Sequence, residues 1–150
     1  MEGWYYLHTN GELIYKRGRG GTAADIRDSD FARALWPMDP RNRENAWQLL
    51  VEASAAGANP ARIKELAEKW KCDDEDADNY AARVGVKLLR DGNQWMAVTE
   101  GFIDMMETPS GYGFGTTKLE AFAELAKALG YKPSKMWGAT FKDLVKGVRA

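Results

Sequence analysis

The side-chain types that most often carry nucleophilic or metal-centred chemistry are scarce in this chain, which has one histidine, His8, and one cysteine, Cys72. A single imidazole cannot supply the ligands of a zinc triad, and a single thiol can form neither a disulfide within the chain nor a cysteine-ligated zinc site. Catalysis by either residue needs a partner acid or base, and no paired signature surrounds them. A thiol at a helix start can acquire a low pKa, but we expect Cys72 to be a small buried hydrophobe and His8 to be a scaffold residue on a strand. We predict no metal, no cofactor and no enzymatic activity.

Acidic residues are concentrated in the stretch CDDEDAD, which carries five carboxylates in the six residues from Asp73. Carboxylates in a first helical turn supply the N-cap and offset the helix dipole, which is our preferred interpretation. Calcium binding is an alternative, although the run lacks the glycine and terminal glutamate of an EF-hand loop. Because such a row could also imitate phosphates, partner binding stays open for Asp74, Glu75, Asp76 and Asp78. The same charges argue against a DNA-binding helix-turn-helix over residues 60–84.

Glycines alternate in GYGFG, residues 111–115, just before a predicted helix. Backbone N–H groups at a helix start can bind phosphate, but the spacing matches neither GxGxxG nor GxxxxGK[ST]. Bulging of a strand or close backbone approach explains the glycines more economically.

The opening stretch WYYLHTNGELIYKR combines aromatic residues with an Asn10-Gly11 turn signal, which predicts a β-hairpin with a two-residue type I′ turn. Leu7 then faces Ile14, and strand alternation places one set of side chains on a common, core-facing side: Trp4, Tyr6, His8, Leu13, Tyr15 and Arg17. A lone hairpin is marginally stable, so this face must pack on something. Part of it could instead contact a partner, through Trp4, Tyr6, Tyr15 and Arg17. Basic residues beside tyrosines also keep contact with RNA or single-stranded DNA open.

The helices and strands that must position these residues are predicted from the spacing of apolar residues and from the prolines and glycines that start or end them. We expect short helices over about 28–36 and 40–56, the second with Trp47, Leu50, Val51 and Ser54 on one stripe and Gly57 as its stop. Apolar spacing predicts two further helices, 60–70 and 74–84, which form an αα-hairpin.

After Gly85 we expect antiparallel strands 86–89, 94–98 and 102–107, a helix from Thr117 to 129 opened by a Thr117/Glu120 capping box, and a short final helix around Phe141 to Val148. The fold class is therefore α+β: an N-terminal β-hairpin, a helical middle with an αα-hairpin, and a C-terminal antiparallel β-β-β-α module plus a short terminal helix. We divide the chain into 1–83 and 84–150, as sub-modules of one compact unit.

Composition narrows the protein class. The chain has 150 residues, a net charge of −1, and six Trp, six Tyr and five Phe, enough for a sizeable core. Near-neutral charge gives no general basis for nucleic-acid binding. We expect no signal peptide and no membrane span, because no apolar run approaches the ~18 residues that a span needs.

Residues 84–131 resemble the HicB-type antitoxin domain, a partial ribonuclease-H-like β-β-β-α unit common in bacteriophage and prophage proteins. The residues that carry the resemblance are Asp91, Gly92, Trp95, Gly113, Gly115, Thr116, Glu120, Ala121 and Leu125. The opening WYYLHTNGELIYK with DSDFARALWPMD also resembles the start of uncharacterised prophage-encoded proteins. In HicB-type antitoxins the unit binds a partner protein and has no hydrolytic centre. The ribonuclease-H carboxylate set is not recognisable here, since Asp104 alone cannot form a two-metal site, nor is a separate DNA-binding segment evident.

These observations together predict a non-enzymatic, phage- or prophage-derived protein of the bacterial cytoplasm that acts through protein–protein interaction. The sequence specifies neither its partner nor its oligomeric state. One alternative is an inhibitor of a host defence system, of anti-CRISPR or anti-restriction type. Another is a small nucleic-acid-binding protein that uses the basic rim of the first hairpin.

Overall fold

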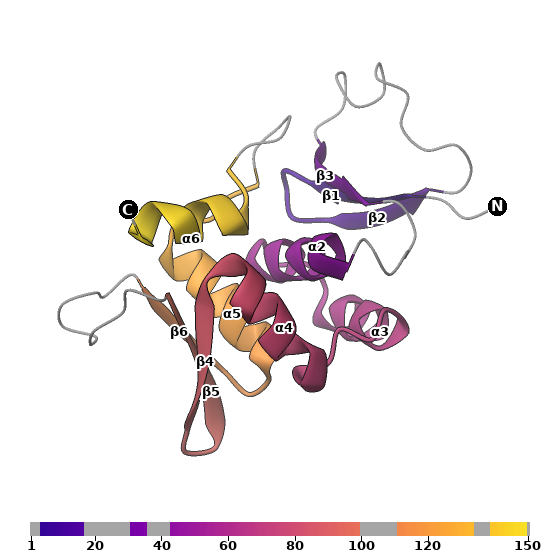
Figure 1. Cartoon of the computed structure of the whole chain (residues 1–150). Helices are drawn as coiled ribbons and strands as arrows, with labels where there is room; N and C mark the ends of the chain where they lie inside the picture. Colours follow the sequence, from indigo (N-terminus) through magenta and orange to yellow (C-terminus); the bar gives the residue numbers. More distant parts are fainter. Residues whose placement is uncertain (1–3, 17–30, 36–42, 100–110, 134–138, 150) are drawn as a thin grey trace.

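The computed structural model describes residues 4–16, 31–35, 43–99, 111–133 and 139–149, which form two three-stranded antiparallel sheets and a set of helices (Figure 1). This confirms the α+β class. The elements in chain order are β1 (Trp4–His8), β2 (Leu13–Lys16), β3 (Phe31–Leu35), α2 (Arg43–Ala55), α3 (Pro60–Lys69), α4 (Asp74–Val84), β4 (Val86–Asp91), β5 (Gln94–Thr99), β6 (Tyr112–Gly115), α5 (Lys118–Ala128) and α6 (Phe141–Arg149).

The first hairpin forms where the sequence predicts it, but with a different turn. Leu7 pairs with Leu13 rather than with Ile14, so the loop is one residue longer than expected. Gly11 has a φ of +92°, and its N–H donates to the His8 carbonyl at 3.0 Å, while the His8 N–H donates to the Glu12 carbonyl. These bonds close a three-residue loop, Thr9 to Gly11, that ends in a left-handed glycine. Asn10 does not have the positive φ that the expected type I′ turn requires. Gly11 also lies against the Ala56 carbonyl, where any Cβ would overlap it.

The predicted division of the hairpin into faces is wrong, because a shift of one residue in register moves one strand's side chains to the other face. Tyr5 and Leu7, which were expected to face outward, are buried in the main core with Leu13 packed against them. Tyr6 lies on the opposite face and is also buried, at 1% exposure. Buried side chains therefore lie on both faces of β1.

The segment expected to be a helix over 28–36 contains a strand instead. Residues 31–35 form β3, which pairs antiparallel with β1 and completes the sheet in the order β2-β1-β3. The edge of β1 that β2 leaves open has unpaired backbone groups, and their pairing outweighs the helix preference of a short Ala-containing segment. Residues 17–30 and 36–42 lie outside the described residues.

Helix α2 is the central element. The predicted single stripe is too narrow, since Ala46, Leu49, Glu52 and Ala53 are buried as well as Trp47, Leu50 and Val51. α2 packs against β3, α3, α4, α5 and α6, and Figure 1 shows it between the first sheet and α5. Gly57 follows it with a φ of +93°, as expected for a helix stop.

Helices α3 and α4 begin and end as the sequence predicts. Asn59 accepts a hydrogen bond from the Ala61 N–H, Asp73 accepts one from the Asp76 N–H, and Gly85 ends α4 in the left-handed conformation. The predicted αα-hairpin differs in its packing: α3 packs mainly on α2, and α4 on α2, α5, α6 and β4. Both helices therefore pack on α2 more than on each other.

The second sheet has the order β4-β5-β6. β4 and β5 pair antiparallel, as predicted, and join through Gly92 and Asn93. The strand expected at 102–107 lies outside the described residues, and the third strand described is β6. Gly113 and Gly115 lie against the backbone of α5, where a Cβ would overlap the Leu125 and Ala121 amides. Close backbone approach thus explains the glycines of GYGFG.

Aromatic rings from both halves of the chain meet in one core. Trp47 of α2 stacks on Tyr80 of α4 with centroids 5.4 Å apart, and Phe122 of α5 packs edge-on to both. Phe141 of α6 contacts Tyr80 and Phe122. The boundary proposed after residue 83 stays a prediction.

Candidate functional site

The acidic run at the start of α4 is used largely within the molecule. Asp73 is the N-cap, which confirms the capping interpretation. Asp74 accepts a hydrogen bond from the Lys118 N–H at 3.3 Å, and Asp78 forms an ion pair with Lys118 Nζ at 3.2 Å. Glu75 is exposed. Of the four carboxylates kept open for partner binding, three therefore have contacts inside the chain.

Asp76 makes the closest set of these contacts. Its Oδ2 accepts hydrogen bonds from Arg43 Nη2 at 2.6 Å, Arg43 Nε at 3.2 Å and Trp47 Nε1 at 2.8 Å. Burial opposes ionisation of this carboxyl, but the hydrogen bonds from Trp47 and Arg43 outweigh it, so the pKa of Asp76 is lowered. Arg43 also donates to the Trp70 and Lys71 carbonyls. The group ties the start of α2 to the link between α3 and α4.

Lys118 joins α4 to the start of α5. This lysine is only 8% exposed, and its ammonium donates to the Asp74 carbonyl at 3.0 Å and lies 4.5 Å from the centroid of the Trp95 ring. A buried ammonium needs such partners. The contacts fix the relative positions of the two helix starts.

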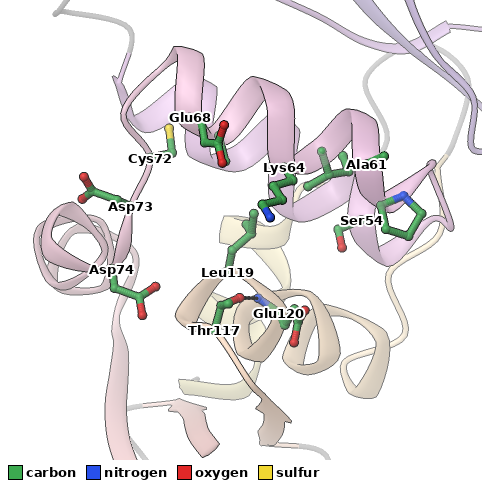
Figure 2. A pocket seen from close by; sticks show the side chains of 13 residues that line it. Ser54, Ala61, Lys64, Glu68, Cys72, Asp73, Asp74, Thr117, Leu119 and Glu120 are labelled. Carbon is green, nitrogen blue, oxygen red and sulfur yellow. Dashed lines mark hydrogen bonds between the residues drawn. The ribbon is translucent and has the colours of Figure 1, made fainter.

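A groove of about 700 Å³ lies between α3 on one side and the starts of α4 and α5 on the other, and we call it the α3–α5 groove (Figure 2). Its apolar lining includes Ala61, Ile63, Ala67 and Leu119. Figure 2 shows Ser54 near one end and Cys72 and Asp73 at the other. Volumes of 300–1,000 Å³ are typical of ligand sites.

Charged side chains surround the apolar lining. Lys64 and Glu68 reach from α3, Asp74 extends from α4 toward the space between the helices, and Asp73 and Glu120 lie at the two helix starts (Figure 2). Four carboxylates and one ammonium therefore line the groove.

Both helix starts at the groove are already capped. Thr117 Oγ1 accepts from the Glu120 N–H at 3.1 Å, which confirms Thr117 as the N-cap of the predicted capping box. The return bond differs from the predicted one, because Glu120 Oε2 accepts from the N–H of Thr116, at 2.9 Å, rather than from that of Thr117. At α4, Asp73 Oδ1 accepts from the Asp76 N–H at 3.0 Å. The first-turn N–H groups of Asp76, Lys118 and Glu120 are thus engaged by the chain's own side chains.

Cys72 lines the groove but is not a reactive thiol. Its side chain is buried and its Sγ lies 3.8 Å from the Trp70 carbonyl. Burial raises the pKa of the thiol to about 12, against a smaller opposing influence of Arg43. The expectation of a small buried hydrophobe is confirmed.

The candidate residues of the first hairpin do not form one exposed patch. Tyr6 is buried, Tyr15 is 37% exposed, and Arg17 and the side chain of Trp4 lie outside the described residues. His8 is half-buried on β1.

The tyrosine that lies beside basic side chains is Tyr5, and these side chains come from α3 rather than from the hairpin rim. Its ring contacts Tyr15 at 4.8 Å and Trp70 at 4.9 Å, with the Arg62 guanidinium 5.6 Å and the Lys69 ammonium 5.9 Å from its centroid. Because Tyr5 is buried, its ring is not open to a nucleobase, and Tyr15 is the accessible ring of this pair.

The α3–α5 groove was not predicted from the sequence. Ala61, Lys64 and Glu68 lie on the side of α3 that periodicity assigns to solvent, and Leu119 was placed on the buried stripe of α5, where it is half-buried. Of its lining residues, Asp73 and Asp74 belong to the acidic run that the sequence singles out, and they lie at one end of the groove. Residues of four helices, α2 to α5, line the groove, so no local pattern could reveal it.

Within the described ranges, no group of three or more His, Cys, Asp or Glu side chains is placed to hold a metal ion. Among the described helices, none has the length and apolar character to cross a membrane. No protein-family model, curated protein or solved structure matches the chain.

Proposed function

We propose that this chain is a non-enzymatic protein that acts by binding a partner protein, and that the α3–α5 groove is the docking surface. The observation that carries the proposal is the groove itself, which has a volume of about 700 Å³ and a largely apolar lining. Residues of four helices, α2 to α5, line it, and Lys118 and Arg43 hold these helices in fixed positions. A preformed apolar groove binds a peptide segment without the cost of ordering the receptor.

The side chains in the groove favour binding over chemistry. The Cys72 thiol, with its pKa raised to about 12, is protonated at neutral pH and is a poor nucleophile. Asp73 and Glu120 are engaged in helix capping. His8 lies on β1, an element that contributes no side chain to the groove.

The acidic run gives less support to phosphate mimicry. Asp76 and Asp78 pair with Arg43 and Lys118, and Asp74 accepts a hydrogen bond from the Lys118 N–H, so three of the four carboxylates of this set already have partners within the chain. The phage or prophage origin, the bacterial cytoplasmic location and a role against host defence rest on the sequence resemblance and stay predictions. Nucleic-acid binding at the hairpin rim also stays a prediction, whose test is binding to an oligonucleotide that weakens steeply with salt.

The experiment is affinity purification from a lysate of cells that encode the chain, comparing two variants of matched chemistry. Ala61→Trp fills the α3–α5 groove, while Ala128→Trp adds the same ring on an exposed position of α5 outside it. We expect the native protein and Ala128→Trp to retain the same partner protein and Ala61→Trp to lose it. Circular dichroism checks that both variants fold. Equal retention by both variants, or retention of nothing, would contradict the proposal.

A further inference from the structure

We infer that the segment bound in the α3–α5 groove is a short extended peptide with apolar side chains and at least two Lys or Arg residues. The inference rests on the proposed function and names the chemistry of its partner. Three observations support it: the negative charge of the groove wall, the capping of the starts of α4 and α5 by the chain's own side chains, and the length of the apolar lining.

The wall has an excess of negative charge. Glu68, Asp73, Asp74 and Glu120 face one cation, Lys64. The hydrogen bonds of Asp73, Asp74 and Glu120 use one oxygen each, Oδ1, Oδ1 and Oε2. A carboxylate has about four acceptor positions on two oxygens, so each retains capacity for an incoming ammonium or guanidinium.

An anionic ligand is disfavoured at the same place. The helix starts of α4 and α5 would attract an anion through their free N–H groups and dipoles. Asp73 and Thr117 already accept bonds from these turns, and Asp74 accepts one from the Lys118 N–H. A phosphate would meet carboxylates rather than donors, which argues against nucleic acid in this groove.

The dimensions favour a peptide a few residues long. The lining side chains follow α3 from Pro60 to Glu68, and eight steps of ~1.5 Å give a length of roughly 12 Å. An extended chain advances ~3.3 Å per residue, so about four residues span it. Ala61, Ala67 and Leu119 offer apolar surface along this length, and the charges lie around it.

The test is selection of a random seven-residue peptide library displayed on phage against the folded protein, with Ala61→Trp as the counter-selection. We expect the peptides that prefer the native protein to contain apolar residues and two or more Lys or Arg. Enrichment of acidic or uncharged apolar peptides would overturn this inference and leave the proposed function standing. No enrichment over Ala61→Trp would overturn both.

One enriched peptide, labelled with fluorescein, then tests the position of the charges by anisotropy. Glu68→Lys reverses a charge on the groove wall, and Glu75→Lys makes the same change on α4 outside the groove. We expect Glu68→Lys to weaken binding about fivefold or more and Glu75→Lys less than about twofold, since exposed charge pairs contribute modestly. The opposite order would move the site to the acidic run and contradict the inference, as would competition by a single-stranded oligonucleotide.

Discussion

Replacing Asp76 tests whether the contacts at the start of α4 hold the helices together. In Asp76→Ala, Arg43 loses two charge-assisted hydrogen bonds and the buried indole N–H of Trp47 loses its acceptor. A bond to a charged group contributes about 1.5–3 kcal/mol and an unsatisfied buried donor costs about 1–3 kcal/mol. The side chains of Arg43 and Asp76 are 32% and 26% exposed, so water recovers part of this loss, and we expect destabilisation of about 3 kcal/mol. Asp76→Asn retains an acceptor without the charge and should cost about half as much.

Urea unfolding followed by tryptophan fluorescence measures the effect. With an m value of about 1.5 kcal/mol/M, Asp76→Ala should lower the midpoint by about 2 M without changing m. Glu75→Gln is the matched control, because it removes a neighbouring exposed carboxylate and should change stability by about 0.5 kcal/mol or less. Equal midpoints for Asp76→Ala and Glu75→Gln would refute the assignment of stabilising contacts to Asp76.

The pH dependence of the same comparison has a defined sign. The pKa of Asp76 is lowered in the folded protein relative to its value of about 3.9 in an unfolded chain. Its contribution to stability is therefore complete above about pH 5 and is lost as pH falls through the folded-state pKa. The stability difference between the native protein and Asp76→Asn should stay constant from about pH 7 to 5 and shrink below about pH 4. A difference that grows on acidification would contradict the lowered pKa.

Three further predictions concern the core and the thiol. Gly113→Ala places a Cβ against the backbone of α5 and should destabilise the fold by about 2 kcal/mol or more. Gly147→Ala, which has open space around it in α6, should stabilise the fold by about 0.5 kcal/mol. Thermal unfolding measures both changes, and equal effects would contradict the close approach at Gly113. The Cys72 thiol should react with a thiol reagent at pH 8 only when denaturant unfolds the protein, and rapid labelling of the native state would contradict its burial. Tyr131→Phe removes the 2.8 Å hydrogen bond to the buried carboxyl of Glu52 and should cost about 1–2 kcal/mol in urea unfolding, while an unchanged midpoint would show that the bond is dispensable.

Helix α4 shows what local sequence can predict. Its predicted bounds, 74–84, and the capping role of the acidic run are both confirmed, with Asp73 as the N-cap and Gly85 at the C-cap. Each depends on contacts among residues close in sequence, which periodicity and capping rules describe.

The first sheet shows where local signals fall short. Asn10-Gly11 correctly predicts a hairpin, but the choice of loop depends on the fit of Gly11 against Ala56 at the end of α2, a contact 45 residues away along the chain. The strand at 31–35 likewise forms because β1 lies beside it. Tertiary contacts decide both cases, and they also assemble the α3–α5 groove from Ala61, Asp74 and Leu119.

The central position of α2 limits where recombination between genes can divide this chain. Its Trp47 packs on Phe122, its Glu52 accepts a hydrogen bond from Tyr131, and its Glu44 pairs with Lys142, all partners from the C-terminal half. A recombination event that carried residues 84–150 into another gene would leave those surfaces uncovered unless the recipient supplied an equivalent helix. We therefore expect the two halves to travel together between genomes, and exchanges that survive to fall within the surface loops rather than at residue 84.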